Sequence, residues 1–129
     1  MATTTLTKEN FKETLEKGGT VFIDFWAAWC GPCRNFAPIY EKASEKHAGI
    51  TFAKVNTEEQ PELAGMFQIE SIPTIMVFRE KVLLFAQPGA LLGDALDEIA
   101  EQIQKLDMDD VRKKIAEAEE KEKAGEKGA

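Results

Sequence analysis

The stretch Val21-Phe22-Ile23-Asp24-Phe25-Trp26-Ala27-Ala28-Trp29-Cys30-Gly31-Pro32-Cys33-Arg34 sets the architecture of this 129-residue chain. Its first half is apolar and rich in β-branched and aromatic residues, which is typical of a strand buried on both faces. The second half holds two cysteines on either side of Gly31-Pro32, and a helical pattern of apolar residues follows at once. The stretch therefore predicts a central strand that leads through a short turn into a helix.

The spacing of the two cysteines favours redox chemistry. Pro32 fits the first turn of a helix, where its missing N–H costs little, and Gly31 allows a tight turn that leaves one sulfur uncovered. Cys30 would then lie at the positive end of the helix, where unpaired N–H groups stabilise an anion such as a thiolate. Because the thiolate attacks in disulfide exchange, we expect Cys30 to be the nucleophile and Cys33 to resolve the mixed disulfide.

Other roles for the two cysteines fit the sequence less well. A zinc site needs about four ligands, but the chain has two cysteines and one histidine, His47, to which we assign no role. A purely structural disulfide and a pair of inert buried cysteines are further alternatives. A loop of four residues, however, constrains the unfolded chain little, so redox chemistry is the interpretation that we favour.

The stretch from Trp26 to Arg34 closely resembles the active-site motif of thioredoxins, and further similarities extend this resemblance from about Leu6 to Leu106. The resemblance implies an α/β thioredoxin fold with a central mixed sheet of four to five strands and helices on both faces. Alternating strands and helices, followed by a hairpin and a final helix, favour the same class. The implied activity is the reduction of protein disulfides through a reversible Cys30–Cys33 disulfide.

Asp24 interrupts an apolar strand. It shares a face with Phe22 and Trp26, where a bare carboxylate is costly. A buried structural acid with hydrogen-bond partners is one interpretation. Thioredoxins carry an aspartate at the matching position that takes a proton from the second cysteine, so the resemblance assigns this role to Asp24 and makes Lys54 its expected charge partner.

The resemblance also places residues from later in the chain around the dithiol. The thioredoxin proline that matches Pro73 follows a cis bond and faces the cysteines, whereas an ordinary turn or strand-start proline is the alternative. Ile72 would offer backbone groups to an extended substrate segment, in the manner of strand addition. Gly89 would let the substrate backbone approach, and Trp29 would line the groove. The alternatives are an ordinary loop glycine and a packed aromatic side chain.

Composition limits the classes of partner. The chain is 43% hydrophobic and 30% charged, with a formal net charge of −7. The absence of a Lys/Arg-rich block argues against nucleic acid or an anionic membrane as a partner. No apolar run approaches the roughly 18 residues that a membrane span needs, and the first eight residues carry no apolar core. We therefore expect a cytoplasmic protein and a monomer.

The last part of the chain divides into two segments. A stripe of apolar residues predicts an amphipathic helix that closes a thioredoxin domain of residues 1–106: Leu92, Ala95, Leu96, Ile99, Ile103 and Leu106. Residues 107–129 form a charged extension, with 14 charged residues out of 23. Met108, Val111, Ile115 and Ala118 predict a further helix capped by Asp107, with a frayed end.

By resemblance, the protein binds no cofactor and receives electrons from NADPH through a flavin-containing thioredoxin reductase. Its substrates would be disulfide-containing proteins such as ribonucleotide reductase, peroxiredoxin or methionine sulfoxide reductase. The chain departs from the family at Arg79-Glu80-Lys81, where thioredoxins commonly have a glycine turn. The departure and the charged extension keep two alternatives open, a reductant dedicated to one partner enzyme and a thioredoxin-fold binding or assembly module.

Overall fold

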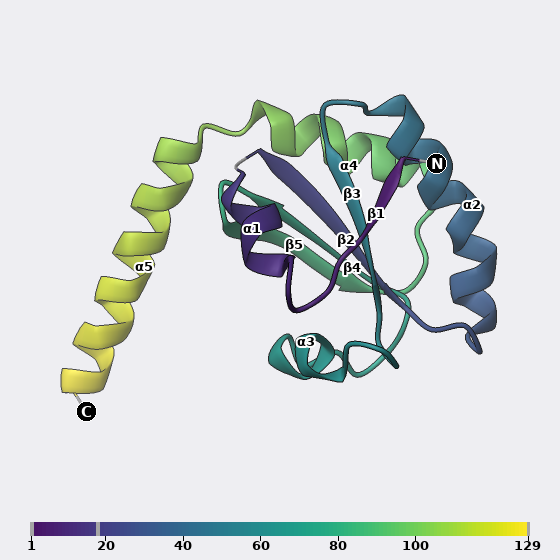
Figure 1. Ribbon diagram of the computed structural model, residues 1–129. Helices are drawn as coiled ribbons and strands as arrows, with labels where there is room; N and C mark the ends of the chain where they lie inside the picture. The colour runs from purple at the N-terminus through teal and green to yellow at the C-terminus, as the bar shows by residue number, and fades with distance from the viewer. Residues whose placement is uncertain (1, 18, 129) are drawn as a thin grey trace.

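A computed structural model describes residues 2–17 and 19–128. The strands and helices alternate along most of the chain (Figure 1), in the order β1 (Thr3–Thr5), α1 (Phe11–Glu16), β2 (Thr20–Trp26), α2 (Gly31–Lys46), β3 (Thr51–Asn56), α3 (Pro61–Met66), β4 (Thr74–Arg79), β5 (Val82–Pro88), α4 (Gly93–Lys105) and α5 (Met108–Gly128). No helix in these described ranges is both long and apolar enough to cross a bilayer.

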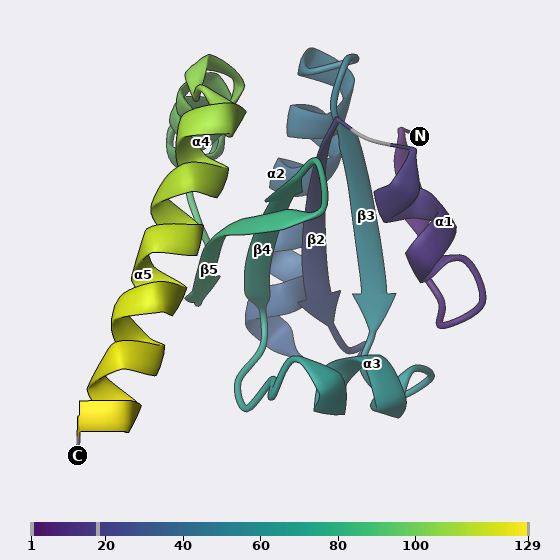
Figure 2. The same ribbon diagram turned by 90° about the vertical axis from the view of Figure 1, so that its left-hand side faces the viewer.

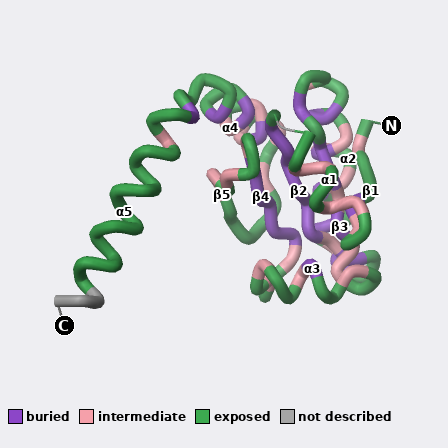
Figure 3. Tube along the Cα trace, turned by 60° about the vertical axis from the view of Figure 1, so that its left-hand side comes forward, coloured by how far each residue is buried: buried purple, intermediate pink, exposed green. Residues whose placement is uncertain are grey.

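The five strands form one mixed sheet in the order β1-β3-β2-β4-β5. β3 runs parallel to β1 and β2, whereas β4 is antiparallel to both β2 and β5. Side chains of β2 alternate between two cores: Phe22 packs beneath α2 and α4, while Val21, Ile23 and Phe25 pack beneath α1 and α3. The strand is therefore covered on both faces (Figures 2 and 3), and the predicted thioredoxin fold is confirmed.

The hairpin between β4 and β5 turns without glycine. Glu80 and Lys81 adopt φ angles of +51° and +68°, which two-residue hairpin turns require and which non-glycine residues populate at a cost. Glu80 also contacts the helix α5, because its carboxylate forms an ion pair with Arg112 at 2.9 Å. The missing family glycine thus leaves the turn geometry intact and adds an ion pair.

Lys81→Gly is expected to raise the free energy of unfolding by about 0.5–1 kcal/mol, because the gain at positive φ exceeds the extra entropy of glycine in the unfolded chain. Urea unfolding of both proteins at pH 7 measures this difference. Gly19→Ala is the control with the opposite sign, since Gly19 has φ +81° and open space where a Cβ would lie. Equal stability of wild type and Lys81→Gly would contradict the prediction.

The C-terminal end of α4 is bound by Arg79, the last residue of β4. The guanidinium of Arg79 donates to the carbonyl oxygens of Ile103 (2.8 Å) and Leu106 (2.9 Å) at the end of the helix, where carbonyl groups need partners from outside the helical ladder. Leu92 differs from the prediction, because it precedes the helix and is 74% exposed. The amphipathic stripe that packs on the sheet therefore begins after it, and Leu96, Ala100 and Ile103 are its buried members.

The extension forms the helix α5, which projects away from the sheet (Figures 1 and 3). The predicted cap is present, since the carboxylate of Asp107 accepts hydrogen bonds from the backbone N–H groups of Asp109 and Asp110. Met108 is buried, whereas Ile115, about two turns further along the same face of the helix, is 40% exposed. Only the first turns of α5 are thus held by the domain.

Candidate functional site

The two cysteines form a disulfide at the start of α2. Their Cα atoms lie 5.2 Å apart, and Cys30 is the N-cap residue of the helix. The backbone N–H of Cys33 donates to Sγ of Cys30 at 3.2 Å. One backbone N–H of the first helical turn is thus directed at this sulfur, an arrangement that would stabilise an anion at the same position.

Both cysteines are buried in this oxidised form, with 4% of Cys30 and 2% of Cys33 exposed. The expectation that the turn at Gly31 would leave one sulfur uncovered is therefore not met here. The physical reason is apolar packing, because Trp26, Ala27 and Ile72 contact the disulfide. Position in the helix, rather than exposure, distinguishes the two sulfurs.

The segment before β4 closes over the disulfide. The carbonyl oxygen of Ile72 lies 3.8 Å from Sγ of Cys30, and the bond between Ile72 and Pro73 is cis. The backbone N–H of Gly89 donates to the carbonyl oxygen of Pro73 at 2.7 Å. Gly89 has φ +101° with open space at its Cβ position, so backbone conformation rather than close packing requires glycine. The structure thus brings Ile72, Pro73 and Gly89 together beside Cys30.

Trp29 directly precedes Cys30 in the chain and exposes 68% of its surface. Its indole N–H donates to the carboxylate of Glu58 at 2.8 Å, so the ring is held in place although it is exposed. An aromatic side chain that is restrained yet open to solvent fits a contact surface better than it fits packing.

Asp24 is fully buried in the middle of β2, and neither oxygen of its carboxylate has a hydrogen-bond partner among the described residues. Burial raises the pKa of Asp24 to about 7, and the positive charge of Lys54 offsets part of this rise. Asp24 shares its face of β2 with Phe22, which packs beneath α2. After burial, the negative charge of Asp24 also raises the pKa of Tyr40 in that helix. Asp24 can therefore hold or release a proton near neutral pH.

Lys54 lies next to Asp24 in the neighbouring strand, where the two residues are register partners. No ion pair joins them in the part of the chain that the structure describes. The ammonium of Lys54 lies instead 4.9 Å from the ring centroid of Trp26, a cation–π arrangement. Lys54 therefore acts on Asp24 through its field rather than through a direct contact.

The family model described as Thioredoxin matches residues 2–105. The chain belongs to the thioredoxin family.

Its thioredoxin relatives include two bacterial proteins. A Streptomyces coelicolor protein described as "Putative thioredoxin 2" is 57% identical over 116 residues, which cover 90% of this chain and 87% of that protein. Thioredoxin of Alicyclobacillus acidocaldarius is 44% identical over 76% of this chain and 98% of its own length. The solved structure of Plasmodium falciparum thioredoxin superposes with a TM-score of 0.71 at 31% identity, covering 77% of this chain and 97% of that one.

As a thioredoxin, the protein is a thiol–disulfide oxidoreductase that reduces protein disulfides through the reversible Cys30–Cys33 disulfide. Thioredoxins carry no cofactor, and the described residues contain no cluster of three or more side chains suited to a metal ion. Family membership also implies two general kinds of partner, a reductase and disulfide-containing substrates.

Two polar residues of the thioredoxin site were missed in the sequence. Glu58 holds Trp29, as described above, and Arg34 donates to the carbonyl oxygen of Ala28 at 2.9 Å, which fixes the turn before Cys30. Arg34 follows the second cysteine directly, so its place beside the turn could have been inferred. Glu58 is 29 residues from Trp29 in the chain, and only the fold brings the two together.

His47 lies at the other end of α2 from the dithiol. Its Nε2 atom contacts the carboxylate of Asp97 at 2.7 Å, and Lys46 reaches the second oxygen of the same carboxylate at 2.7 Å. These contacts join α2 to α4 and give His47 a structural place.

Proposed function

We propose that Cys30 is the attacking residue of this reductase and Cys33 the resolving one. The thiolate of Cys30 attacks one sulfur of a substrate disulfide, forms a mixed disulfide and releases the first substrate thiolate. The thiolate of Cys33 then attacks Sγ of Cys30, which closes the Cys30–Cys33 disulfide and releases the second substrate thiolate. The N-cap position of Cys30 carries this assignment, because the backbone N–H of Cys33 that donates to its sulfur favours the thiolate.

Asp24 is the proposed proton acceptor for Cys33. A carboxyl with a pKa of about 7 is poised to accept a proton at neutral pH, which is the condition for effective general base catalysis. Burial beneath α2 shields it from bulk water, so it can serve the resolving thiol during the lifetime of the mixed disulfide.

The substrate segment is proposed to lie in extended form between Trp29 and the Ile72–Pro73 segment, with the backbone of Ile72 as its pairing partner. Gly89 leaves the approach open, since no side chain extends from it. The active-site turn, formed by Trp29, Gly31 and Pro32, presents Cys30 to this segment. These roles are supported by the 3.8 Å contact of Ile72 with Cys30 and by the exposure of Trp29.

We further propose that residues 1–106 form the catalytic domain and residues 107–129 an appendage. One copy suffices for catalysis, because both cysteines and the groove come from the same chain, so the working unit is a monomer. A flavin-containing thioredoxin reductase would return electrons from NADPH. Ribonucleotide reductase, peroxiredoxin and methionine sulfoxide reductase are the proposed substrates, and the cytoplasm, where such reductants act, is the proposed location.

Insulin reduction with dithiothreitol as electron donor tests the proposed function. Wild type should precipitate insulin well above the dithiothreitol background, and Cys30→Ser should return the rate to that background because serine supplies no thiolate. A wild type no faster than background would overturn general disulfide reduction. A Cys30→Ser variant as fast as wild type would overturn the role of Cys30.

A further inference from the structure

Leu92 occupies a position that ordinarily belongs to a polar residue. It is the N-cap of α4, with φ −75° and ψ 157°. Serine, threonine, aspartate and asparagine are preferred there because their side chains accept a hydrogen bond from the first turn, which leucine cannot do. Leu92 exposes 74% of its surface, so packing does not compensate for the lost cap. Its neighbour Leu91 packs against the core beneath α2 and α4, and Leu92 is left pointing into solvent.

The exposed leucine follows the Gly89 end of the proposed substrate groove in the chain. Gly89, three residues earlier, is bonded through its N–H to Pro73, and three residues span at most about 10 Å. On its other side, Gly93 approaches Ile39 of α2, since a Cβ at Gly93 would lie 3.9 Å from that side chain. Leu92 is thereby placed in the chain between Gly89, which is bonded to the Pro73 segment, and the third turn of α2.

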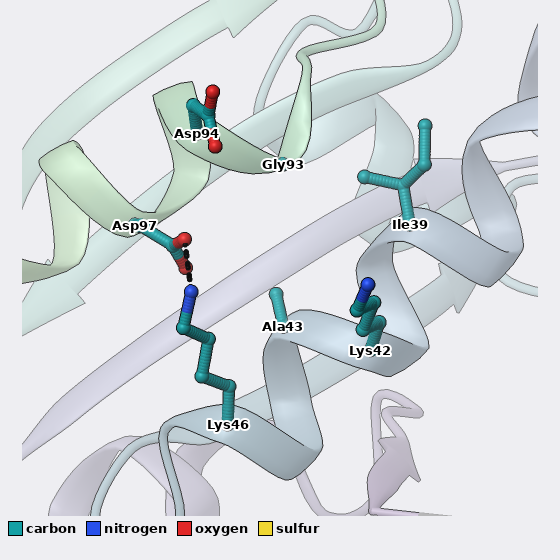
Figure 4. A pocket seen from close by; sticks show the side chains of 7 residues that line it. All are labelled: Ile39, Lys42, Ala43, Lys46, Gly93, Asp94 and Asp97. Atoms are coloured by element: carbon teal, nitrogen blue, oxygen red, sulfur yellow. Dashed lines mark hydrogen bonds and ion pairs between the residues drawn. The ribbon is translucent and has the colours of Figure 1, made fainter.

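Exposure singles out two apolar side chains. Leu92 (74%) and Trp29 (68%) are the two most exposed large apolar side chains in the described part of the chain. Trp29 precedes Cys30 directly, and Leu92 follows Gly89 by three residues. A shallow groove of about 280 Å³ lies between α2 and α4, and its lining includes Ile39 and Gly93, the residue after Leu92 (Figure 4). The ion pair between Lys46 and Asp97 bridges the groove further along.

We infer that Leu92 extends the substrate site of this reductase and binds an apolar side chain of the polypeptide that carries the target disulfide. The inference rests on the proposed function and adds a contact outside the groove formed by Trp29, Ile72, Pro73 and Gly89. The occupant is an extended segment of a protein substrate that leaves the dithiol across Gly89 toward α4. A small disulfide that reaches only the sulfurs does not touch Leu92. Leu92 is therefore a specificity-determining residue for protein substrates.

Leu92→Ser separates this role from stability, because the two effects have opposite signs. Serine restores a helix cap, so the melting temperature should rise by about 3–5 °C. Loss of the apolar contact should lower kcat/KM for insulin by about five- to tenfold, the change expected for half of a buried leucine side chain. The rate with bis(2-hydroxyethyl) disulfide should equal that of wild type.

Two matched variants complete the experiment. Leu92→Met keeps an apolar side chain without a cap and should retain the wild-type kcat/KM for insulin without the gain in melting temperature. Leu83→Ser removes an exposed leucine six residues before Gly89 in the chain and should leave kcat/KM unchanged.

Equal kcat/KM for insulin in wild type and Leu92→Ser, while Cys30→Ser is inactive, would overturn the inference and leave the proposed function intact. An equal fall for insulin and for the small disulfide would also overturn it, because it would indicate a disturbed dithiol. Wild type without insulin turnover would remove both the proposed function and this inference.

Discussion

A Cys33→Ser variant mixed with a disulfide-containing protein is expected to accumulate as a covalent complex through Cys30, while turnover falls to the background of the chemical reductant. Cys30 keeps its place at the N-terminus of α2, so the first attack still proceeds. The serine hydroxyl cannot attack the mixed disulfide at neutral pH, and the intermediate persists. Non-reducing electrophoresis and mass spectrometry of the complex measure the result.

The matched control for this trap is the double variant Cys30→Ser/Cys33→Ser, which should form no covalent complex with the same substrate. Dithiothreitol should release the trapped substrate from Cys33→Ser. If Cys30→Ser instead accumulated the complex and Cys33→Ser did not, the two sulfurs would have the reverse roles, and the assignment based on the helix N-terminus would be wrong.

Asp24→Asn is expected to stabilise the protein at pH 8 on the order of 4 kcal/mol, because the folded state holds a proton with a pKa of about 7 instead of 3.8. Below about pH 3 the carboxyl is protonated in both the folded and the unfolded state, because its ordinary pKa is 3.8. As the pH rises toward 7, only the unfolded chain releases the proton freely, so wild type loses stability over this interval. Urea unfolding between pH 4 and pH 8 should show this slope in wild type and its absence in Asp24→Asn.

Asp97→Asn is the matched control for the pH series. Hydrogen bonds from Lys46 and then His47 lower the pKa of Asp97, so this carboxylate stabilises the fold above its ordinary pKa and loses that effect on acidification. The Asp97→Asn variant should therefore be less stable than wild type at pH 7 and should keep the slope between pH 4 and pH 7. A wild type whose stability does not fall over that interval would contradict the raised pKa of Asp24.

The same Asp24→Asn variant should slow insulin reduction at pH 7 by roughly ten- to a hundredfold, near the lower end of the contribution of a general base. An increase in stability together with a loss of rate distinguishes a proton acceptor from a structural acid. If the rate at pH 7 stayed at the wild-type level, Asp24 would have no part in proton transfer.

Periodicity explains why the architecture could be read from the sequence. The strand Val21–Trp26 is apolar on both faces because the structure places a separate core on each of them, and Phe22 and Ile23 fall on opposite sides as alternation requires. Pro32 and Gly31 likewise determine the turn into α2 through their own backbone preferences. Such signals are local, so a single sequence contains them.

Contacts between distant segments were harder to predict. Register placed Lys54 beside Asp24, but the side chain of Lys54 lies over Trp26 instead, a choice that depends on its full surroundings. The bond from Trp29 to Glu58 joins two segments that only the sheet brings together. Leu92 fitted the helical stripe by spacing, yet α4 begins one residue later. The exposure of Leu92 depends on how the N-terminus of α4 packs against α2.

The position of α5 provides an attachment point for labelling or immobilising the protein. Arg112 of α5 pairs with Glu80. Glu80 follows Arg79, which is the register partner of Thr20 at the start of β2. The dithiol follows the opposite end of β2, so α5 is attached at the end of the strand that is remote from the cysteines. With 21 residues, α5 is about 30 Å long and leads away from the side of the sheet that α2 occupies (Figure 1). A fluorophore, an affinity bead or an electrode linked through its distal turns would thus be carried by a helical spacer, away from α2 and the dithiol at its start.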